Sequence, residues 1–329
     1  MAYNFPLIYP ACASVEYMAF PLRIGSRASR LALLQAETVA RGLLHAHGLG
    51  KSDIRLEPIS TKGDNIKEKP LWEMGGKGLF TENIESQLLR GDLDLAVHSL
   101  KDMPTKPTDG LRSDIMLERG DARDMLIVSP KSDVGDISIK TLKPAGCIGT
   151  CAPRRMAQLS WMRPDLKMVS LRGNVETRLS KLESGGMDAI VLACAGLERL
   201  GIEPGNAVTL PVDEMLPAAG QGVIAIQYRE SDDRVRELLT SLHHQETGLC
   251  VAIEKGFLEA LNGSCVTPAG AYARARNERF HFTGRLLSLD GTELREVYEE
   301  ADITGIDDAV ALGRRAGEAL LRQRPQRRA

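Results

Sequence analysis

The sequence predicts an α/β fold divided into two or three domains. Its 329 residues exceed one ordinary domain and suit two or three domains of roughly 100 residues each. Strand-like and amphipathic helical stretches alternate through the first two thirds, as in proteins whose helices cover parallel or mixed sheets. The hydrophobic fraction of 43% can fill such cores, and the charged fraction of 26% suits their surfaces.

Two early segments show clear periodicity. Residues 31–44 carry apolar side chains at helical spacing, with polar residues between them: Leu31, Leu34, Val39, Leu43 and Leu44. Ser29 lies just upstream and is a good N-cap for this helix. Residues 92–97 alternate polar and apolar, which predicts a half-buried strand.

A short pattern occurs twice in the chain. Residues 88–97 (LLRGDLDLAV) and 182–191 (LESGGMDAIV) both show a helix end, a glycine, an aspartate three residues later and an apolar strand. Two ordinary helix ends followed by buried strands would give the same letters, so coincidence and duplication both stay open. If the repeat is real, it predicts two similar halves with a cleft between them, and ligands often bind in such clefts.

The pattern changes after Tyr228. Residues 231–262 are predicted to be helical, and residues 271–276 and 280–289 are predicted strands. Residues 306–322 form a predicted amphipathic helix. A smaller α+β domain therefore completes the predicted fold.

Composition disfavours two classes of function. The net charge of -2 gives no global basic field, and the aromatic fraction of 4% offers few platforms for stacking bases, so no nucleic-acid partner is expected. The longest apolar runs, such as residues 190–195, are far shorter than the roughly 20 residues of a membrane helix. No membrane partner is expected either.

The cysteines and the N-terminal segment indicate the compartment. Six cysteines occur without the CxxC spacing of zinc or redox sites, which favours reduced thiols and no metal, and Cys194 is expected in the core. Residues 1–22 lack the features of a secretory signal or a transit peptide and are predicted to be a disordered tail. The cytoplasm is the expected location.

Eight basic residues lie in or beside glycine-containing turns: Arg27, Lys77, Lys101, Arg154, Arg155, Arg172, Arg178 and Arg199. Several follow predicted strands, where α/β folds place ligands. Pro153 suits the first turn of a helix, whose N-terminal N–H groups attract anions. Each cation taken alone is more often solvated or paired with a nearby carboxylate. Taken together, the eight residues indicate a polyanion site and an ordinary charged surface about equally.

Three further residues have a chemical and a structural interpretation. Asp102 precedes a turn, where an aspartate is usually a local cap, and His98 at a strand end is usually structural. Cys265 lies among small residues in NGSCVTPAG. Most isolated cysteines are inert, but a thiol in an open turn can serve as a nucleophile or an attachment point.

Six motifs in order give these residues a common interpretation. IGSRAS, GGKGLFTENIE, AVHSLKDMPT, SLRGNVETRL, LPAAGQG and NGSCVTPAG resemble the porphobilinogen deaminase family from Arg23 onward. HSLKDMPT and LRGNVETRL are the most specific of them. The resemblance implies three domains, the first two similar to type II periplasmic binding proteins and the third a small α+β domain. It places domain 1 at residues 23–120 and 222–240, domain 2 at 121–221, and domain 3 at 241–329.

The resemblance also implies a reaction. In this family a cysteine holds a dipyrromethane cofactor by a thioether, and Cys265 matches it. Four porphobilinogen molecules are added to this primer with loss of ammonia, and water releases hydroxymethylbilane. Asp102 matches the catalytic aspartate. Porphobilinogen is therefore the expected partner, and a monomer is the family's usual state.

Matching motifs imply a set of residues that bind the carboxylates of cofactor and substrate: Arg27, Ser29, Asp64, Lys77, Ser99, Lys101, Thr150, Arg154, Arg155, Arg172, Arg178, Arg199 and Gln221. The glycine-rich stretch 61–78 is the candidate mobile lid. Cys151 and Ala152 replace two serines common in the family, Glu73 replaces a lysine of some members, and Arg30 replaces a frequent proline. A non-catalytic protein that binds a small polycarboxylate is the alternative function.

Overall fold

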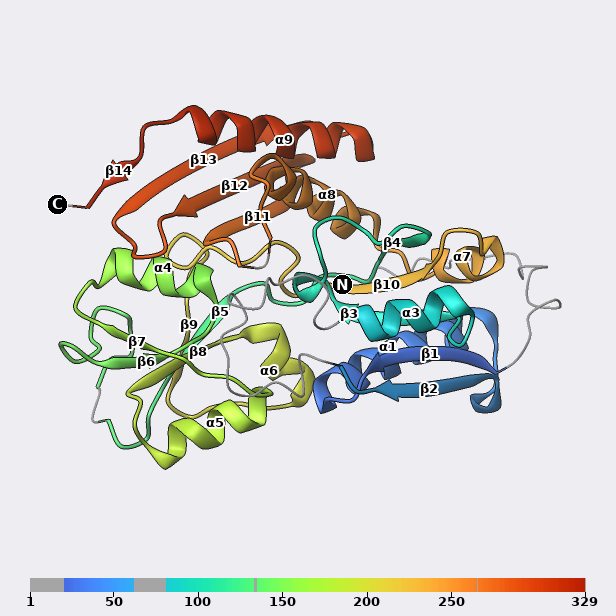
Figure 1. Cartoon of the computed structure of the whole chain (residues 1–329), viewed down its shortest axis with the longest axis horizontal. Coiled ribbons are helices and arrows are strands. Elements are labelled where there is room, and N and C mark those ends of the chain that lie inside the picture. The colour runs from blue at the N-terminus through green and yellow to red at the C-terminus, as the bar shows by residue number, and fades with distance from the viewer. Residues whose placement is uncertain (1–20, 62–80, 133–134, 265, 329) are drawn as a thin grey trace, which may run out of the picture.

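The computed structural model describes residues 21–61, 81–132, 135–264 and 266–328. Within these ranges the chain forms two five-stranded sheets and one four-stranded sheet, each covered by helices (Figure 1). All but the last two residues of the predicted tail lie outside the described residues, as does most of the predicted lid. No described helix is long and apolar enough to cross a membrane.

The first sheet has the order β2-β1-β3-β10-β4. Its strands are β1 (Leu22–Arg27), β2 (Ile54–Ile59), β3 (Leu95–Ser99), β4 (Leu111–Met116) and β10 (Ile224–Arg229). Its helices are α1 (Arg30–His47), α3 (Glu82–Arg90) and α7 (Asp233–Thr240), and the one-turn helix η4 (Leu100–Asp102) follows β3. Strands β2, β1 and β3 are parallel, and β10 runs antiparallel between β3 and β4.

The second sheet has the order β7-β6-β8-β5-β9. Its strands are β5 (Asp124–Val128), β6 (Cys147–Gly149), β7 (Lys167–Val169), β8 (Ala189–Ala193) and β9 (Ala207–Thr209). Its helices are α4 (Pro153–Met162), α5 (Val175–Ser184) and α6 (Cys194–Leu200). Here β7, β6 and β8 are parallel, and β5 is antiparallel to both β8 and β9.

The repeated sequence pattern occupies the same place in both sheets. Asp94 accepts a hydrogen bond from the Arg23 amide at 2.7 Å, which ties β3 to β1. Asp188 accepts one from the Cys147 amide at 2.7 Å, which ties β8 to β6 in the same way. Gly91 and Gly185 end the preceding helices, both with positive φ. The echo in the sequence is therefore a repeated structural unit.

The third sheet has the order β11-β12-β13-β14 and lies across the other two in Figure 1. Its strands are β11 (Ala269–Arg276), β12 (Arg279–Leu287), β13 (Glu293–Ala301) and β14 (Gln326–Arg327), with helices α8 (Gln245–Ala260) and α9 (Ile306–Arg322). The two helices pack closely, since a Cβ on Gly313 would lie 2.0 Å from the Ile253 carbonyl oxygen. The apolar core of this part includes Phe257 and Phe282.

The chain crosses between the first two sheets twice, after β4 and before β10. At the crossing the Gly120 amide donates to the Gly222 carbonyl at 3.1 Å. Glu254 of α8 is fully buried there and accepts hydrogen bonds from Arg119 Nη1 at 2.5 Å and the Gly220 amide at 2.7 Å. The third part of the chain thus holds both crossings through one carboxylate.

Most predicted elements are present, with two corrections. The first helix begins after Ser29, which accepts from the Ala32 amide, and α9 has the predicted bounds. Residues 92–97 were expected to be half-buried, but β3 is almost wholly buried because it lies between β1 and β10. The predicted helix 231–262 is two helices, α7 and α8.

Candidate functional site

The candidate site begins where two parallel strands of the first sheet end. β1 ends at Arg27. After β3 the one-turn helix η4 bends the chain, and Asp102 is the last residue of η4. Asp102 Oδ2 lies 3.9 Å from Arg27 Nη1, and the aspartate side chain is 40% exposed. Because the carboxyl ends of parallel neighbours meet at one sheet edge, the fold brings together two residues that lie 75 positions apart.

A small cavity of about 50 Å³ lies beside this pair. Arg27, Ser29, Ser99 and Asp102 all line it, so four residues predicted from the sequence meet here. Gln35 of α1 also lines it and exchanges hydrogen bonds with Ser99 at 2.8 and 3.1 Å. Gln35 was not predicted as a site residue. The feature of α1 that indicates a special role for Gln35 is the burial of this polar side chain on the inner face of the helix.

His98 lies in the same wall but has a structural partner. Its Nε2 is 3.1 Å from Gln227 Oε1 of β10, and the side chain is buried. Burial lowers the pKa of His98 to about 4, with the nearby Arg27 adding to the shift, so the ring is neutral near pH 7. The structural interpretation of His98 therefore agrees with its surroundings.

Lys101 lies close to the point where the chain crosses between the two sheets. Its Nζ donates to Gln221 Oε1 at 3.4 Å, and Gln221 in turn donates to Asp124 Oδ1 at 2.9 Å. Burial and the positive charge of Arg155 lower the pKa of Lys101 to about 8, against the opposing effect of Asp102. The half-buried ammonium of Lys101, whose pKa is lowered, lacks full compensation by protein carboxylates.

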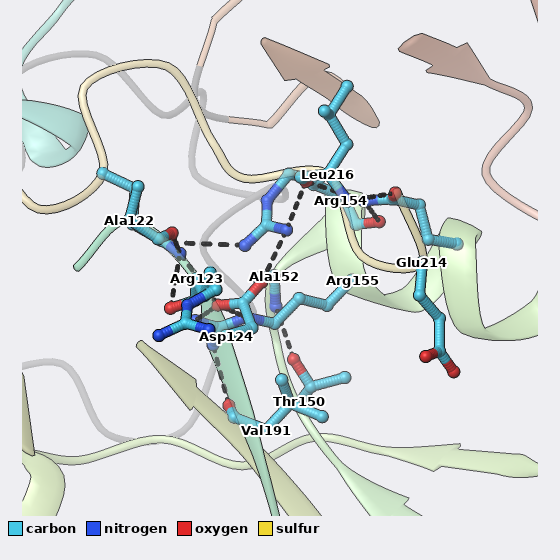
Figure 2. A network of polar contacts seen from close by, with 12 residues as sticks. Ala122, Arg123, Asp124, Thr150, Ala152, Arg154, Arg155, Val191, Glu214 and Leu216 are labelled. Atoms are coloured by element: carbon cyan, nitrogen blue, oxygen red, sulfur yellow. Dashed lines mark hydrogen bonds and ion pairs between the residues drawn. The ribbon is translucent and has the colours of Figure 1, made fainter. Parts of the chain in front are cut away.

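Asp124 holds two of the predicted site cations (Figure 2). Arg154 Nη1 and Arg155 Nη2 each lie 2.7 Å from one of its oxygens, and all three side chains are buried. Burial disfavours the charged carboxylate, but the two guanidiniums more than offset this and keep the pKa of Asp124 well below its ordinary value. The sequence did not reveal Asp124, although a carboxylate that opens the apolar strand β5 was a visible signal.

Backbone oxygens complete the contacts of both arginines. Arg154 Nη1 also donates to the Leu216 carbonyl at 2.7 Å, and Arg155 Nη1 to the Val191 carbonyl at 2.8 Å. Thr150 accepts from the Ala152 amide at 3.3 Å, just before α4 begins at Pro153 as predicted (Figure 2). Arg154 and Arg155, both predicted carboxylate ligands, are thus bound to the protein's own groups.

The remaining predicted cations lie on other elements of the second half. Arg178 of α5 donates to the Gly173 carbonyl at 2.8 Å, and its pKa is lowered by burial and by neighbouring Arg155. Arg172 is half-buried and close enough to contribute to that shift. Arg199 Nη2 donates to the Gly222 carbonyl at 2.6 Å, which places it at the chain crossing. Asp64, Lys77 and Cys265 lie outside the described residues.

The charge balance fits a ligand that carries several carboxylates. Lys101 and Arg178 make their described hydrogen bonds to neutral oxygens, and burial lowers the pKa of both. Anionic groups placed beside them would stabilise their charged forms. A dipyrromethane with acidic side chains meets this requirement, and Asp102 could accept hydrogen bonds from its pyrrole N–H groups. The residues present therefore fit such a cofactor.

Fold and site together define an α/β protein with two similar halves and a group of basic residues that suits a polycarboxylate ligand. Family models agree with this and go further. Residues 22–237 match "Porphobilinogen deaminase, dipyromethane cofactor binding domain", and residues 248–322 match "Porphobilinogen deaminase, C-terminal domain". The chain belongs to the porphobilinogen deaminase family, and it is accordingly a transferase of tetrapyrrole biosynthesis with a dipyrromethane cofactor.

Curated relatives support the same family. Porphobilinogen deaminases of Nitrobacter hamburgensis and Nitrobacter winogradskyi are each 44% identical over 301 residues, which cover 90% of this chain and 93% of theirs. Among solved structures, the amino acid ABC transporter substrate-binding protein AbpA from Streptococcus pneumoniae is 13% identical with a TM-score of 0.39. That match covers 67% of this chain and 86% of AbpA. At that score the likeness carries no argument, and the α/β architecture rests on the sheets described above.

Proposed function

We propose that this chain joins four porphobilinogen molecules head to tail, with Asp102 as the carboxylate at the reacting pyrroles. The hydroxymethylbilane synthase reaction follows from its family. The observation that supports the role of Asp102 is its position: an exposed carboxylate 3.9 Å from Arg27, with Lys101 and Arg178 close enough to feel its charge. It is an open carboxylate, whereas Asp124 is buried and paired with two arginines.

Asp102 would act on the charge that develops in the substrate. When the aminomethyl C–N bond of porphobilinogen breaks, the electron pair leaves with ammonia and the pyrrole becomes a cation. A fixed carboxylate beside this cation lowers the barrier, and its oxygens can accept the pyrrole N–H. The bound cofactor supplies the free pyrrole carbon to which the first unit is joined.

The basic residues would hold the carboxylates of substrate and growing chain. Arg27, Lys101, Arg172 and Arg178 are proposed as direct ligands, since carboxylates suit ammonium and guanidinium donors. Arg154 and Arg155 belong to the same site, and their pairing with Asp124 fixes the region around Gln221. Ser29, Ser99, Thr150 and Gln221 would add neutral donors, Arg199 would act from the crossing, and Asp64 and Lys77 are proposed from their motifs.

The proposed organisation follows the three sheets. Domain 1 comprises residues 23–120 and 222–240, domain 2 residues 121–221, and domain 3 residues 241–329, with the cofactor on Cys265. The strands of the three sheets, apart from the first residue of β1, fall within these ranges. A monomer in the cytoplasm is proposed, supported by the free thiols of the four described cysteines.

Intact-protein mass tests this function directly. Wild-type protein is expected to exceed its sequence mass by two linked pyrrole units, and Cys265→Ser is expected to show no excess. Cys147→Ser, which removes a half-buried thiol from β6, is the matched control and should keep the excess. On incubation with porphobilinogen, wild type should then release ammonia and Cys265→Ser should not. A wild type with neither adduct nor ammonia release would favour the non-catalytic polycarboxylate-binding protein.

A further inference from the structure

Two motifs contain residues to which the proposed mechanism gives no role. HSLKDMPT continues past Asp102 to Thr105, and NGSCVTPAG reaches Gly263 two positions before Cys265. In the structure these two segments meet, because Thr105 Oγ1 donates a hydrogen bond to the Gly263 carbonyl at 3.1 Å. The contact joins positions 158 residues apart. It connects the segment that carries the catalytic aspartate to the segment that carries the cofactor cysteine.

The Asp102 side of this contact is firmly held. Leu100 and Met103 pack in a small apolar cluster with Val251 of α8, so the bend around Asp102 rests on the third part of the chain. The Met103 amide donates to the Leu100 carbonyl at 3.0 Å, which closes the turn. Pro104 then fixes its own φ and restricts the direction in which the chain reaches Thr105.

The Gly263 side is equally fixed. After α8 ends, Asn262 adopts a positive φ of 49°, and the Gly263 amide donates to the Leu258 carbonyl at 2.8 Å. This is the hydrogen-bond pattern of a helix end whose last turn is closed by a left-handed residue. The Ser264 amide donates to Thr267 Oγ1 at 2.9 Å, which anchors the next residue. The Gly263 carbonyl is therefore a well-defined acceptor.

We propose that Thr105 is a positioning residue that sets the distance between Asp102 and the cofactor-bearing loop. The inference rests on the proposed function, because it assumes Asp102 as the catalytic carboxylate and Cys265 as the attachment point. Thr105 lies three positions after Asp102, and Gly263 lies two positions before Cys265, so little chain is available to absorb an error. A displacement of about 1 Å at a reacting centre can slow an enzyme roughly a hundredfold.

Thr105→Val tests the proposal because it keeps the shape of the side chain and removes the hydroxyl. The variant is expected to carry the full cofactor mass and to melt near wild type. Its kcat should fall between about tenfold and a hundredfold, while KM for porphobilinogen stays within about twofold, since the substrate-binding cations are untouched. Thr105→Ser restores a donor at the same place and should recover most of kcat.

Thr108→Val is the matched control on the same loop. Thr108 Oγ1 donates to Glu85 Oε2 of α3 at 2.9 Å, a contact that does not involve the cofactor loop, so kcat should stay at the wild-type value. A Thr105→Val enzyme with kcat equal to that of Thr108→Val would overturn the proposal, as would failure of Thr105→Ser to recover kcat. If Thr105→Val does not fold, Thr105→Ala takes its place under the same criteria. A wild type without the cofactor mass would instead refute the proposed function.

Discussion

The two α/β halves share one topology but use their carboxylates differently. Counting from the equivalent residues Asp94 and Asp188, the position of Asp102 in the first half is taken by Gly196 in the second. The second half has its own carboxylate, Asp124, where the first has the apolar Ile224 of β10. Asp102 is 40% exposed, whereas Asp124 is 0% exposed and bound by two arginines.

Under the proposed mechanism, the difference explains how a repeated fold carries one reactive site. A carboxylate already neutralised by two guanidiniums has no charge to offer a developing cation, so Asp124 suits a structural task. A carboxylate at an open bend, with an arginine only as near as 3.9 Å, suits the proposed contact with the substrate. The role of a carboxylate is therefore indicated less by its position in the sheet than by whether nearby cations already compensate its charge. Five experiments test this contrast.

The largest effect is expected from Asp124→Asn. The change keeps the shape of the side chain but leaves two buried guanidiniums without their counter-charge, which should cost about 3–5 kcal/mol of folding free energy. Urea denaturation at pH 7 measures the loss. Asp121→Asn is the control, because Asp121 pairs with the more exposed Arg123 at 2.6 Å and such a pair contributes at most about 1 kcal/mol. Equal losses would contradict the structural role of Asp124.

Asp102→Asn should act in the opposite way, on activity and not on stability. The exposed side chain can change without burying an unpaired group, so the melting temperature should stay near wild type. Loss of the carboxylate charge should lower kcat by roughly a hundredfold to a thousandfold, the usual effect of removing one fixed group that stabilises transition-state charge. Steady-state rates of hydroxymethylbilane formation provide the measurement, and near-normal turnover would exclude the role.

Lys101 links the two halves electrostatically and should give the site an alkaline limit. Its pKa of about 8 in the protein without cofactor means that Cys265→Ser, which cannot attach the cofactor, loses this positive charge as the pH rises through 8. The affinity of Cys265→Ser for porphobilinogen should therefore decline up to about tenfold per pH unit above that value. Adding Lys101→Arg keeps the charge and should move the decline upward. A binding profile that is flat from pH 7 to pH 9.5 in Cys265→Ser would refute the assignment.

Stability should respond to Lys101 with the opposite sign. The ordinary lysine pKa of 10.5 is higher than the folded value, so between pH 8 and 10.5 the unfolded chain binds more protons. The contribution of Lys101 to the free energy of unfolding of ligand-free protein therefore increases with pH over this window. Comparing Cys265→Ser, which cannot attach the cofactor, with the same protein carrying Lys101→Met by urea denaturation at pH 8 and pH 10 isolates this contribution.

Local signals in the sequence were enough for much of the fold. The helix after Ser29, the helix start at Pro153 and the whole of α9 follow from caps and apolar spacing, which neighbouring residues determine. Strand β13, with the sequence ELREVYEEA, was not predicted because its charged residues have low strand propensity. Its pairing with β12 along nearly its full length overrides that preference, and pairing is not a local property.

The sequence predicted which residues form the site better than it predicted the contacts between them. Motifs indicated Asp102, Arg27 and Ser99, and the structure places these three around one cavity. The sequence did not predict the ion pairs of Arg154 and Arg155 with Asp124, because about 30 residues and a β-strand separate them in the chain. Contacts of that kind depend on how strands order themselves in the sheet. The spacing of residues along the chain does not encode that order.

The smallest expected effect concerns the repeated aspartates themselves. Asp94→Asn weakens a bond to the Arg23 amide and the Arg23 guanidinium at 2.8 Å, with Arg229 also near at 3.8 Å. Asp188→Asn weakens the equivalent amide bond and one ion pair with the exposed Lys143 at 2.7 Å. Both should lower the free energy of unfolding by about 1–2 kcal/mol, the loss in Asp94→Asn being larger because hydrogen bonds to charged arginine are stronger. A larger loss in Asp188→Asn would mean that the two units share their geometry but not the balance of forces that holds it.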